Sequence, residues 1–183
     1  RPVRGMPIAW REIHAGALGK KDHILRAAYL AVISLEVGYI FLAHAFWLPN
    51  QMAAGCLLLA VVLVVTLQFA GGAIASERER GSLDLLLTTP LGPAEIVRGK
   101  TLGVLWHVLP LTLVPCFHAL ILHAMDKKPI WALAEPVTGI ATSVLFAATL
   151  GVMLSLYSRT GGRAFAMGLV VLISASVVLP WAI

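Results

Sequence analysis

Residues 52–75 read MAAGCLLLAVVLVVTLQFAGGAIA, an apolar run that contains no charged side chain. A helix that crosses the hydrocarbon core of a bilayer needs about 20 mostly apolar residues, and this run is long enough. The whole chain has the same character, because 59% of its 183 residues are hydrophobic and 13% are charged. Soluble domains contain roughly 45–50% apolar and about 25% charged residues. The sequence therefore predicts an integral membrane protein.

Four further apolar runs predict spanning helices on both sides of residues 52–75. They cover residues 27–47, 101–122, 136–157 and 164–179. The first run contains one acidic residue, Glu36, and the last is short for a span and ends before Pro180. The predicted fold class is all-α, a polytopic membrane protein with five transmembrane helices. An odd number of spans would leave the two termini on opposite sides, so we expect a sixth helix beyond residue 183.

The positive charges orient these spans. Of the 14 Lys and Arg residues, only Lys127 and Lys128 lie in the connection after the third span, and the turn Leu48–Gln51 carries none. The others precede the first span, join the second and third spans, or follow the fourth. Cytoplasmic loops carry the excess of Lys and Arg, which predicts a cytoplasmic N-terminus in the plasma (cytoplasmic) membrane. Because these charges separate apolar runs, the net charge of +5 does not indicate a nucleic-acid partner.

Residues 5–22 predict a short amphipathic helix before the first span. Met6, Trp10, Ile13 and Ala17 recur at helical spacing, and the basic residues lie elsewhere on the helix. Such a helix lies in the membrane interface, with its aromatic side chain at the depth of the lipid headgroups. A plain cytoplasmic helix is the alternative interpretation.

Residues 76–100, SERERGSLDLLLTTPLGPAEIVRGK, join the second and third spans and are the most informative for function. Gly81 can end the preceding helix and Ser82 can cap a new one. Leu83, Leu86 and Leu87 share one apolar face, which predicts a short amphipathic helix across the membrane plane. Pro93 is suited to begin the helix that enters the third span.

This segment resembles the permease (transmembrane) subunits of type-2 ATP-binding-cassette (ABC) transporters. That family shows an acidic-basic pair, Gly-Thr or Gly-Ser, a leucine-rich turn, Thr-Pro, and Ile-x-x-Gly-Lys. Ser82 stands where threonine is commoner, and Met6 precedes Pro7 where asparagine is usual. The matching residues are Glu77, Glu79, Gly81, Ser82, Leu85, Leu86, Thr89, Pro90, Ile96, Gly99 and Lys100.

The resemblance implies a permease domain over residues 1–183, truncated at its C-terminus, with an elbow helix at 5–22 and a coupling segment at 76–100. It also implies an exporter in which two permeases, identical or different, pair and each docks on an ATPase subunit or a fused ATPase domain. The residues that it assigns to coupling with this partner are Glu77, Glu79, Gly81, Ser82, Asp84, Leu85, Leu86 and Pro90.

The chain itself is expected to be no enzyme and to bind no cofactor, with ATP held by the partner subunit. Gly99-Lys100-Thr101 is the only Gly-Lys-Thr, but a phosphate-binding loop also requires a glycine where Ala94 stands. The residues between Ala94 and Gly99 form no glycine-rich cradle. The transported substrate is not legible in these residues.

Two groups of residues inside the spans are candidates for the transport pathway or for helix packing. A carboxylate at the centre of a span costs about 2.5–3.5 kcal/mol, so Glu36 is expected to face protein or water. Tyr29, Tyr39 and Gln68 are placed near it, as pathway or interhelical residues. Small residues recur every fourth position in the fourth span, and such stripes let helices approach closely. They are Gly139, Ser143, Ala147, Gly151 and Ser155.

Other functions have weaker support in the sequence. His107 and His118 share a face of the third span, and His44 and His123 lie near its outer surface. Without a neighbouring cysteine or carboxylate pair, however, they predict no metal site. Ser174 and Ser176 could serve an intramembrane hydrolase, but they lack a nucleophile motif. A structural membrane subunit without transport is the remaining alternative, and co-purification of an ATPase subunit would separate the permease from both.

Overall fold

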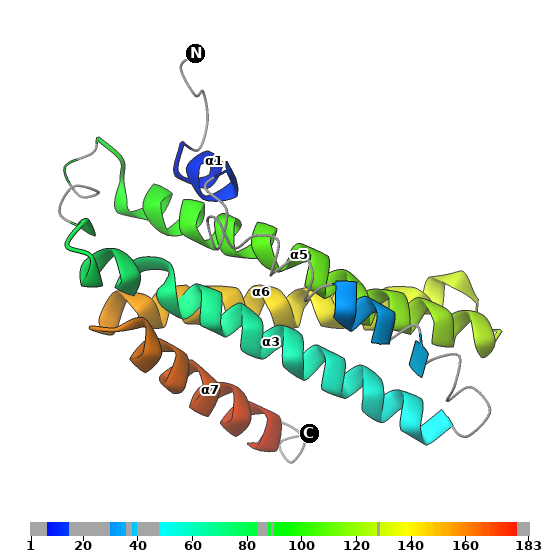
Figure 1. Cartoon of the computed structure of the whole chain (residues 1–183). Helices are drawn as coiled ribbons and strands as arrows, with labels where there is room; N and C mark the ends of the chain where they lie inside the picture. The colour runs from blue at the N-terminus through cyan, green and yellow to red at the C-terminus, as the bar shows by residue number, and fades with distance from the viewer. Residues whose placement is uncertain are drawn as a thin grey trace.

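The computed structural model describes residues 7–14, 30–35, 38–39, 48–83, 88, 90–127 and 129–178. All regular structure in this part of the chain is helical (Figure 1). The elements are α1 (Pro7–His14), α3 (Leu48–Glu79), α5 (Pro93–Met125), the 3-10 helix η2 (Ile130–Leu133), α6 (Ala134–Tyr157) and α7 (Gly161–Val178).

Three of these helices are long and apolar enough to cross a membrane. They cover Gln51–Glu79, Pro93–Met125 and Ile130–Tyr157, and they contain the second, third and fourth predicted spans. The fifth predicted span corresponds to α7, whose apolar stretch, Gly161–Ala175, is shorter. Most of the first predicted span lies outside the described residues, although residues 30–35 are helical. The chain is therefore an all-helical integral membrane protein.

The second spanning helix begins earlier than the sequence indicated. Leu48–Gln51 was predicted to be a turn, but these residues form the first turn of α3. The prediction was wrong because the helix extends beyond the apolar run, and Pro49 is compatible with its first turn. In the first turn of a helix, proline loses no hydrogen bond, since those N–H groups have no partner within the helix.

Helix α5 begins at Pro93, as predicted, and is continuous with the third span. The Gly92 N–H donates to the Glu95 carboxylate at 3.2 Å, so that this side chain closes the first turn. Pro110 and Pro115 lie inside the helix, which nevertheless continues to Met125. Anything that moves the start of α5 therefore acts on one unbroken element that reaches the opposite end of the molecule.

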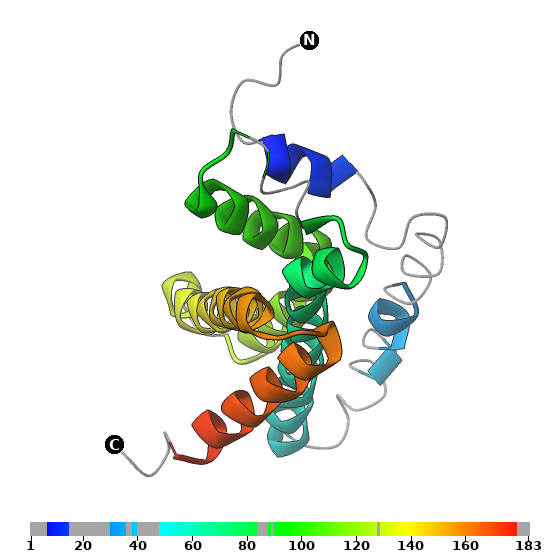
Figure 2. The same ribbon diagram turned by 90° about the vertical axis from the view of Figure 1, so that its left-hand side faces the viewer.

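Helix α3 is the centre of the bundle. Figures 1 and 2 show α5, α6 and α7 lying along it, and all three make extensive contacts with it. Ala70 and Ile74 of α3 pack against Val104 of α5 and against Ala148 and Val152 of α6. A second cluster joins the same three helices nearer to the middle of the bundle. The core therefore consists mainly of small and β-branched side chains, with a few leucines, between closely spaced helices.

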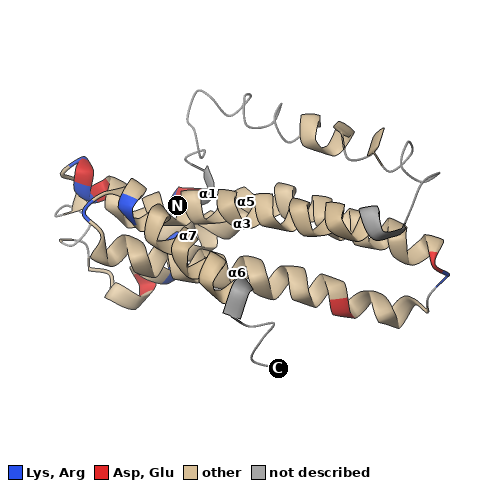
Figure 3. Ribbon diagram, turned by 90° about the horizontal axis from the view of Figure 1, so that it is seen from below, with Lys and Arg blue, Asp and Glu red and all other residues tan. Residues whose placement is uncertain are grey.

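Most of the charged side chains that the structure describes gather at one end of the bundle (Figure 3). We call this the charged end: residues 77–82, the first turns of α5 at 93–100, and the α6–α7 turn at 158–163. The opposite end, here called the far end, comprises residues 48–55 and 118–133. Helix α1 packs on the beginning of α5 and so belongs to the charged end (Figure 2).

Candidate coupling site

Helix α3 ends at the charged end in a hydrogen-bonded turn centred on Gly81. The Ser82 N–H donates to the Glu77 carbonyl at 2.9 Å, and the Gly81 N–H donates to the Arg78 carbonyl at 3.1 Å. This pair of bonds defines a Schellman motif, whose glycine adopts a left-handed conformation. Gly81 has φ of 69°. The predicted helix stop is confirmed, and it fixes the direction in which the chain enters the coupling segment.

Four charged side chains from three helices meet beside this turn. Lys100 of α5 places its Nζ 2.8 Å from Glu12 Oε1 and 3.1 Å from Glu77 Oε1. Arg11 of α1 places its Nη2 3.0 Å and 3.1 Å from the same two oxygens. Two cations and two carboxylates therefore alternate in one network. The Lys100 side chain is only 4% exposed, so its charge depends on these partners.

The carboxylates of the network are held in their charged form by their neighbours. Burial alone would raise the pKa of the Glu12 carboxyl, but the hydrogen bond and charge of Lys100, together with those of Arg11, lower this pKa below its ordinary value of 4.5. The Ser82 hydroxyl also donates to the Glu77 carboxylate and carbonyl. Ser82 thus bonds back toward α3, and the predicted cap on the following helix stays a prediction because residues 84–87 lie outside the described residues.

Helix α1 reaches this network because two glycines make room for it on α5. A methyl group at Gly99 would lie 2.7 Å from Ile8 Cβ, and one at Gly103 would lie 2.5 Å from Glu12 Cβ. A Gly-x-x-x-Gly pattern of this kind lets two helices approach closely. The face that packs on α5 carries Ile8 and Ala9, which are buried, whereas Trp10 is 52% exposed. The apolar face predicted through Trp10 is therefore not the face that contacts α5.

The next two residues of α3 bind the α6–α7 turn. Arg78 donates to the Leu156 carbonyl at 3.0 Å and also to the Ser158 carbonyl, at the C-terminus of α6. Glu79 accepts the N–H of Gly161, the first residue of α7, at 2.9 Å. Together, the three consecutive residues Glu77, Arg78 and Glu79 connect the end of α3 to α1, α5, α6 and α7.

The coupling segment itself is described in part. Leu83 is half-buried and packs against the cluster of Ile8 and Ile96, so this leucine contacts the chain itself. Pro90 is exposed, as is Thr88. Asp84, Leu85 and Leu86, predicted to face the partner, lie outside the described residues.

Of the four predicted pathway residues, the structure describes Tyr39 and Gln68. Glu36 and Tyr29 lie outside the described residues. Tyr39 is half-buried, and Gln68 is exposed on α3.

The small-residue stripe of α6 divides into two parts. Gly139 is exposed with open space around it, and Ser143 is half-buried. Ala147, Gly151 and Ser155 are buried. The Ser155 hydroxyl accepts the N–H groups of Ile74 and Ala75 at 3.0 Å and 2.8 Å. The half of the stripe nearer the charged end thus packs against α3.

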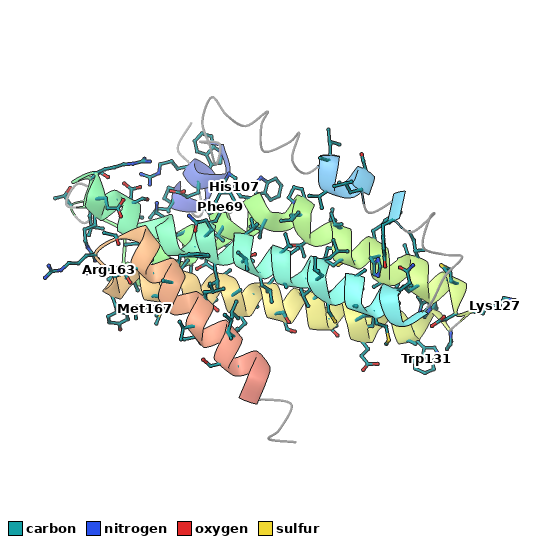
Figure 4. The ribbon with its side chains drawn as sticks, turned by 60° about the horizontal axis from the view of Figure 1, so that its bottom comes forward. Phe69, His107, Lys127, Trp131, Arg163 and Met167 are labelled. Atoms are coloured by element: carbon teal, nitrogen blue, oxygen red, sulfur yellow. The ribbon has the colours of Figure 1, made fainter. Side chains whose placement is uncertain are left out.

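The histidines of α5 have contacts with protein groups. The His107 ring stacks on Phe69 with centroids 6.3 Å apart (Figure 4), and its Nδ1 lies 2.7 Å from the Gly103 carbonyl oxygen. The Nε2 of His118 lies 2.9 Å from the carbonyl oxygen of Gln51. No group of three or more potential metal-ligating side chains occurs among the described residues.

Sequence reasoning missed two parts of this site. It gave Glu12 no role, and it named Gly99 and Lys100 without identifying α1 as their partner. The available signal was Gly103, four residues after Gly99, because this spacing places both glycines on one helix face. Nothing in the local sequence of α1 indicates which helix it contacts.

The fold and the site define a class: a helical membrane protein whose helices are joined by ion pairs and helix-end hydrogen bonds at one end. The family model described as "ABC-2 family transporter protein" matches residues 11–183. The chain therefore belongs to the ABC-2 transporter family. Comparison with curated proteins and with solved structures gives no match.

Proposed function

We propose that this chain is the membrane-spanning permease of an ATP-driven exporter and that its charged end receives movement from an ATP-binding subunit. The observation that carries this proposal is the alternating network of Arg11, Glu12, Glu77 and Lys100. The network joins α3 to α5, and it also joins α1 to both of these helices. Charge-assisted hydrogen bonds with fixed geometry transmit displacement better than apolar contacts that can slide.

The continuity of the long helices supports the same function. The part of the coupling segment that lies between the two helices is bounded by Gly81, just after α3, and by Pro93, which begins α5. Each of these helices extends without interruption to the far end. A push on the segment would therefore tilt two spanning helices together. In this proposal the chain hydrolyses no ATP and binds no cofactor, and the nucleotide is bound by the partner.

The direction of transport and the N-terminal orientation belong to the same proposal. The charged end holds most of the Lys and Arg residues that the structure describes, and such an excess favours the cytoplasmic side. Helix α1 would then lie on the side of the ATPase. Export is the direction that the family resemblance implies, and a second permease completes the transporter.

Cross-linking to the ATPase subunit tests this function. A cysteine that replaces Thr88, exposed in the coupling segment, should cross-link to an ATPase subunit that co-purifies with the chain. A cysteine at Ile130, 75% exposed at the far end, is the matched control and should not. In addition, Leu86→Asp should lower co-purification while leaving the chain inserted in the membrane. An intact complex that cross-links equally at both positions, or a Leu86→Asp chain that keeps its partner fully, would contradict the proposal.

A further inference from the structure

We propose that Arg78 and Glu79 are positioning residues that fasten the α6–α7 turn to the end of α3, so that movement of the coupling segment also reaches α7. This inference rests on the proposed function and extends it to helices that the coupling segment does not adjoin in sequence. Helix α7 follows α6 through a short turn. Without a direct connection, it would respond to the coupling segment only through side-chain packing along α3.

The two charges match the two helix ends that they contact. The C-terminus of a helix carries unpaired carbonyl groups and a partial negative charge, and the N-terminus carries unpaired N–H groups and a partial positive charge. Arg78 binds carbonyl oxygens where α6 ends, and Glu79 binds an N–H where α7 begins. Each contact therefore combines a hydrogen bond with a favourable charge–dipole interaction. Exchanging the two residues would make both interactions unfavourable.

The backbones around Arg78 and Glu79, which we call the clamp, are packed so closely that the α6–α7 turn cannot move independently of α3. A methyl group at Gly71 of α3 would lie 3.1 Å from the Phe165 backbone nitrogen, and one at Gly161 would lie 3.3 Å from the Gly72 Cα. Ser155 adds a hydroxyl that accepts two N–H groups of α3, one turn before Arg78. The α6–α7 turn is thus seated on α3 by close backbone contact, and Arg78 and Glu79 close its open side.

The clamp stands directly beside the predicted input of movement. Arg78 and Glu79 follow Glu77, which belongs to the ion network, and they precede Gly81, where the chain leaves α3 toward the rest of the coupling segment. Rotation of the last turn of α3 would therefore move the Glu77 contacts to α1 and α5 and the clamp to α6 and α7 at the same time. The charged end then acts as one body.

The test uses the chain in complex with the ATPase subunit that co-purifies with it. Cys56 and Cys116 are first replaced by alanine. Spin labels are then attached to cysteines that replace Ala124, exposed on α5 at the far end, and Arg163, exposed in the first turn of α7. The distance between the labels is measured without nucleotide and with ATP plus orthovanadate. We expect nucleotide to shift this distance in the otherwise unaltered chain, and the shift to disappear when Arg78→Gln and Glu79→Gln are combined.

The matched control is Arg159→Gln combined with Glu135→Gln. Arg159 is an exposed arginine of the same turn, and Glu135 is an exposed carboxylate in the first turn of α6, away from the charged end. This variant should keep the full shift. If the clamp variant does not fold, Glu79→Gln alone should still reduce the shift. A shift of equal size in the clamp and control variants overturns the inference, as does an unaltered complex that shows no shift. A chain that binds no ATPase subunit would instead contradict the proposed function.

Discussion

The two ends of the helix bundle are held together in different ways. At the charged end, ion pairs and charged hydrogen bonds connect α3 to α1, α5, α6 and α7. At the far end, α3 and α5 share the contact between His118 and the Gln51 carbonyl. There the buried Gln51 amide group and the His123 Nε2 have no hydrogen-bond partner among the described residues. Directional contacts therefore concentrate where the proposed ATPase would bind.

An apolar groove of about 650 Å³ adjoins the far end. It lies between α5, the start of α6 and residue 33, and its walls include Pro110, Phe117 and Leu133. Apolar contacts are non-directional, so helices separated by such surfaces can change their spacing at low cost. We therefore expect the helix ends to move together at the charged end, and the spacing of the helices to change at the far end.

The largest expected effect on stability comes from removing Lys100, the central cation of the network. Lys100→Met leaves the half-exposed Arg11 as the remaining cation beside the Glu12 and Glu77 carboxylates, and losing one member of a buried ion pair costs about 3 kcal/mol. Lys127→Met removes an exposed lysine at the far end and should change stability by less than about 0.5 kcal/mol. Thermal unfolding of both variants in detergent measures the difference. Equal unfolding midpoints would show that the network contributes no stability.

The close approach of α6 to α3 provides the next largest effect. A Cβ at Gly151 would lie 2.4 Å from the Cβ of Ala70, whereas Gly139, on the same helix, has open space. Gly151→Leu should therefore destabilise the protein by about 2 kcal/mol through overpacking. Gly139→Leu should leave the folded yield in detergent nearly unchanged. Equal yields of the two variants would show that Gly151 does not pack closely against α3.

These two sites also show what sequence reasoning could predict. The apolar runs identified α3, α5 and α6, because hydrophobic periodicity is a local signal. Gly81 and Pro93 identified where α3 ends and where α5 begins, because helix-ending and helix-starting residues also act locally. The stripe on α6 was found from its spacing, but not its partner: Ala70 is far from Gly151 in sequence. Likewise, Lys100 and Glu12 meet only after α1 has docked on α5. Interhelical partners depend on shape complementarity, which periodicity does not encode.

The turn that leads from α3 into the coupling segment should give a smaller effect. Gly81 has φ of 69°, a conformation that costs a residue with a side chain about 1 kcal/mol. Gly92, at the other end of the segment, has φ of −68° and open space around it. We expect Gly81→Ala to destabilise the protein by about 1 kcal/mol and Gly92→Ala to be neutral or slightly stabilising. Unfolding midpoints test this, and a Gly92→Ala chain less stable than Gly81→Ala would contradict it.

The smallest expected effect is the pH dependence of α1 docking. The folded-state pKa of Glu12 lies below its ordinary value of 4.5 because Lys100 and Arg11 favour the carboxylate. A depressed pKa means that the stability supplied by Glu12 is complete above this ordinary value and is lost as the pH falls through the folded-state pKa. Because the Glu12 side chain is 27% exposed, water screens part of the interaction, and the total should stay below about 1 kcal/mol.

The measurement compares the native chain with Glu12→Gln from about pH 7 downward. At neutral pH, the native chain should unfold at the higher temperature, because its carboxylate contacts both Lys100 and Arg11. Below the ordinary pKa of a glutamate, the two unfolding midpoints should converge as the native carboxylate becomes protonated. A difference that stays constant or grows toward acid pH would show that Glu12 acts through shape, by filling the space above Gly103, and not through its charge.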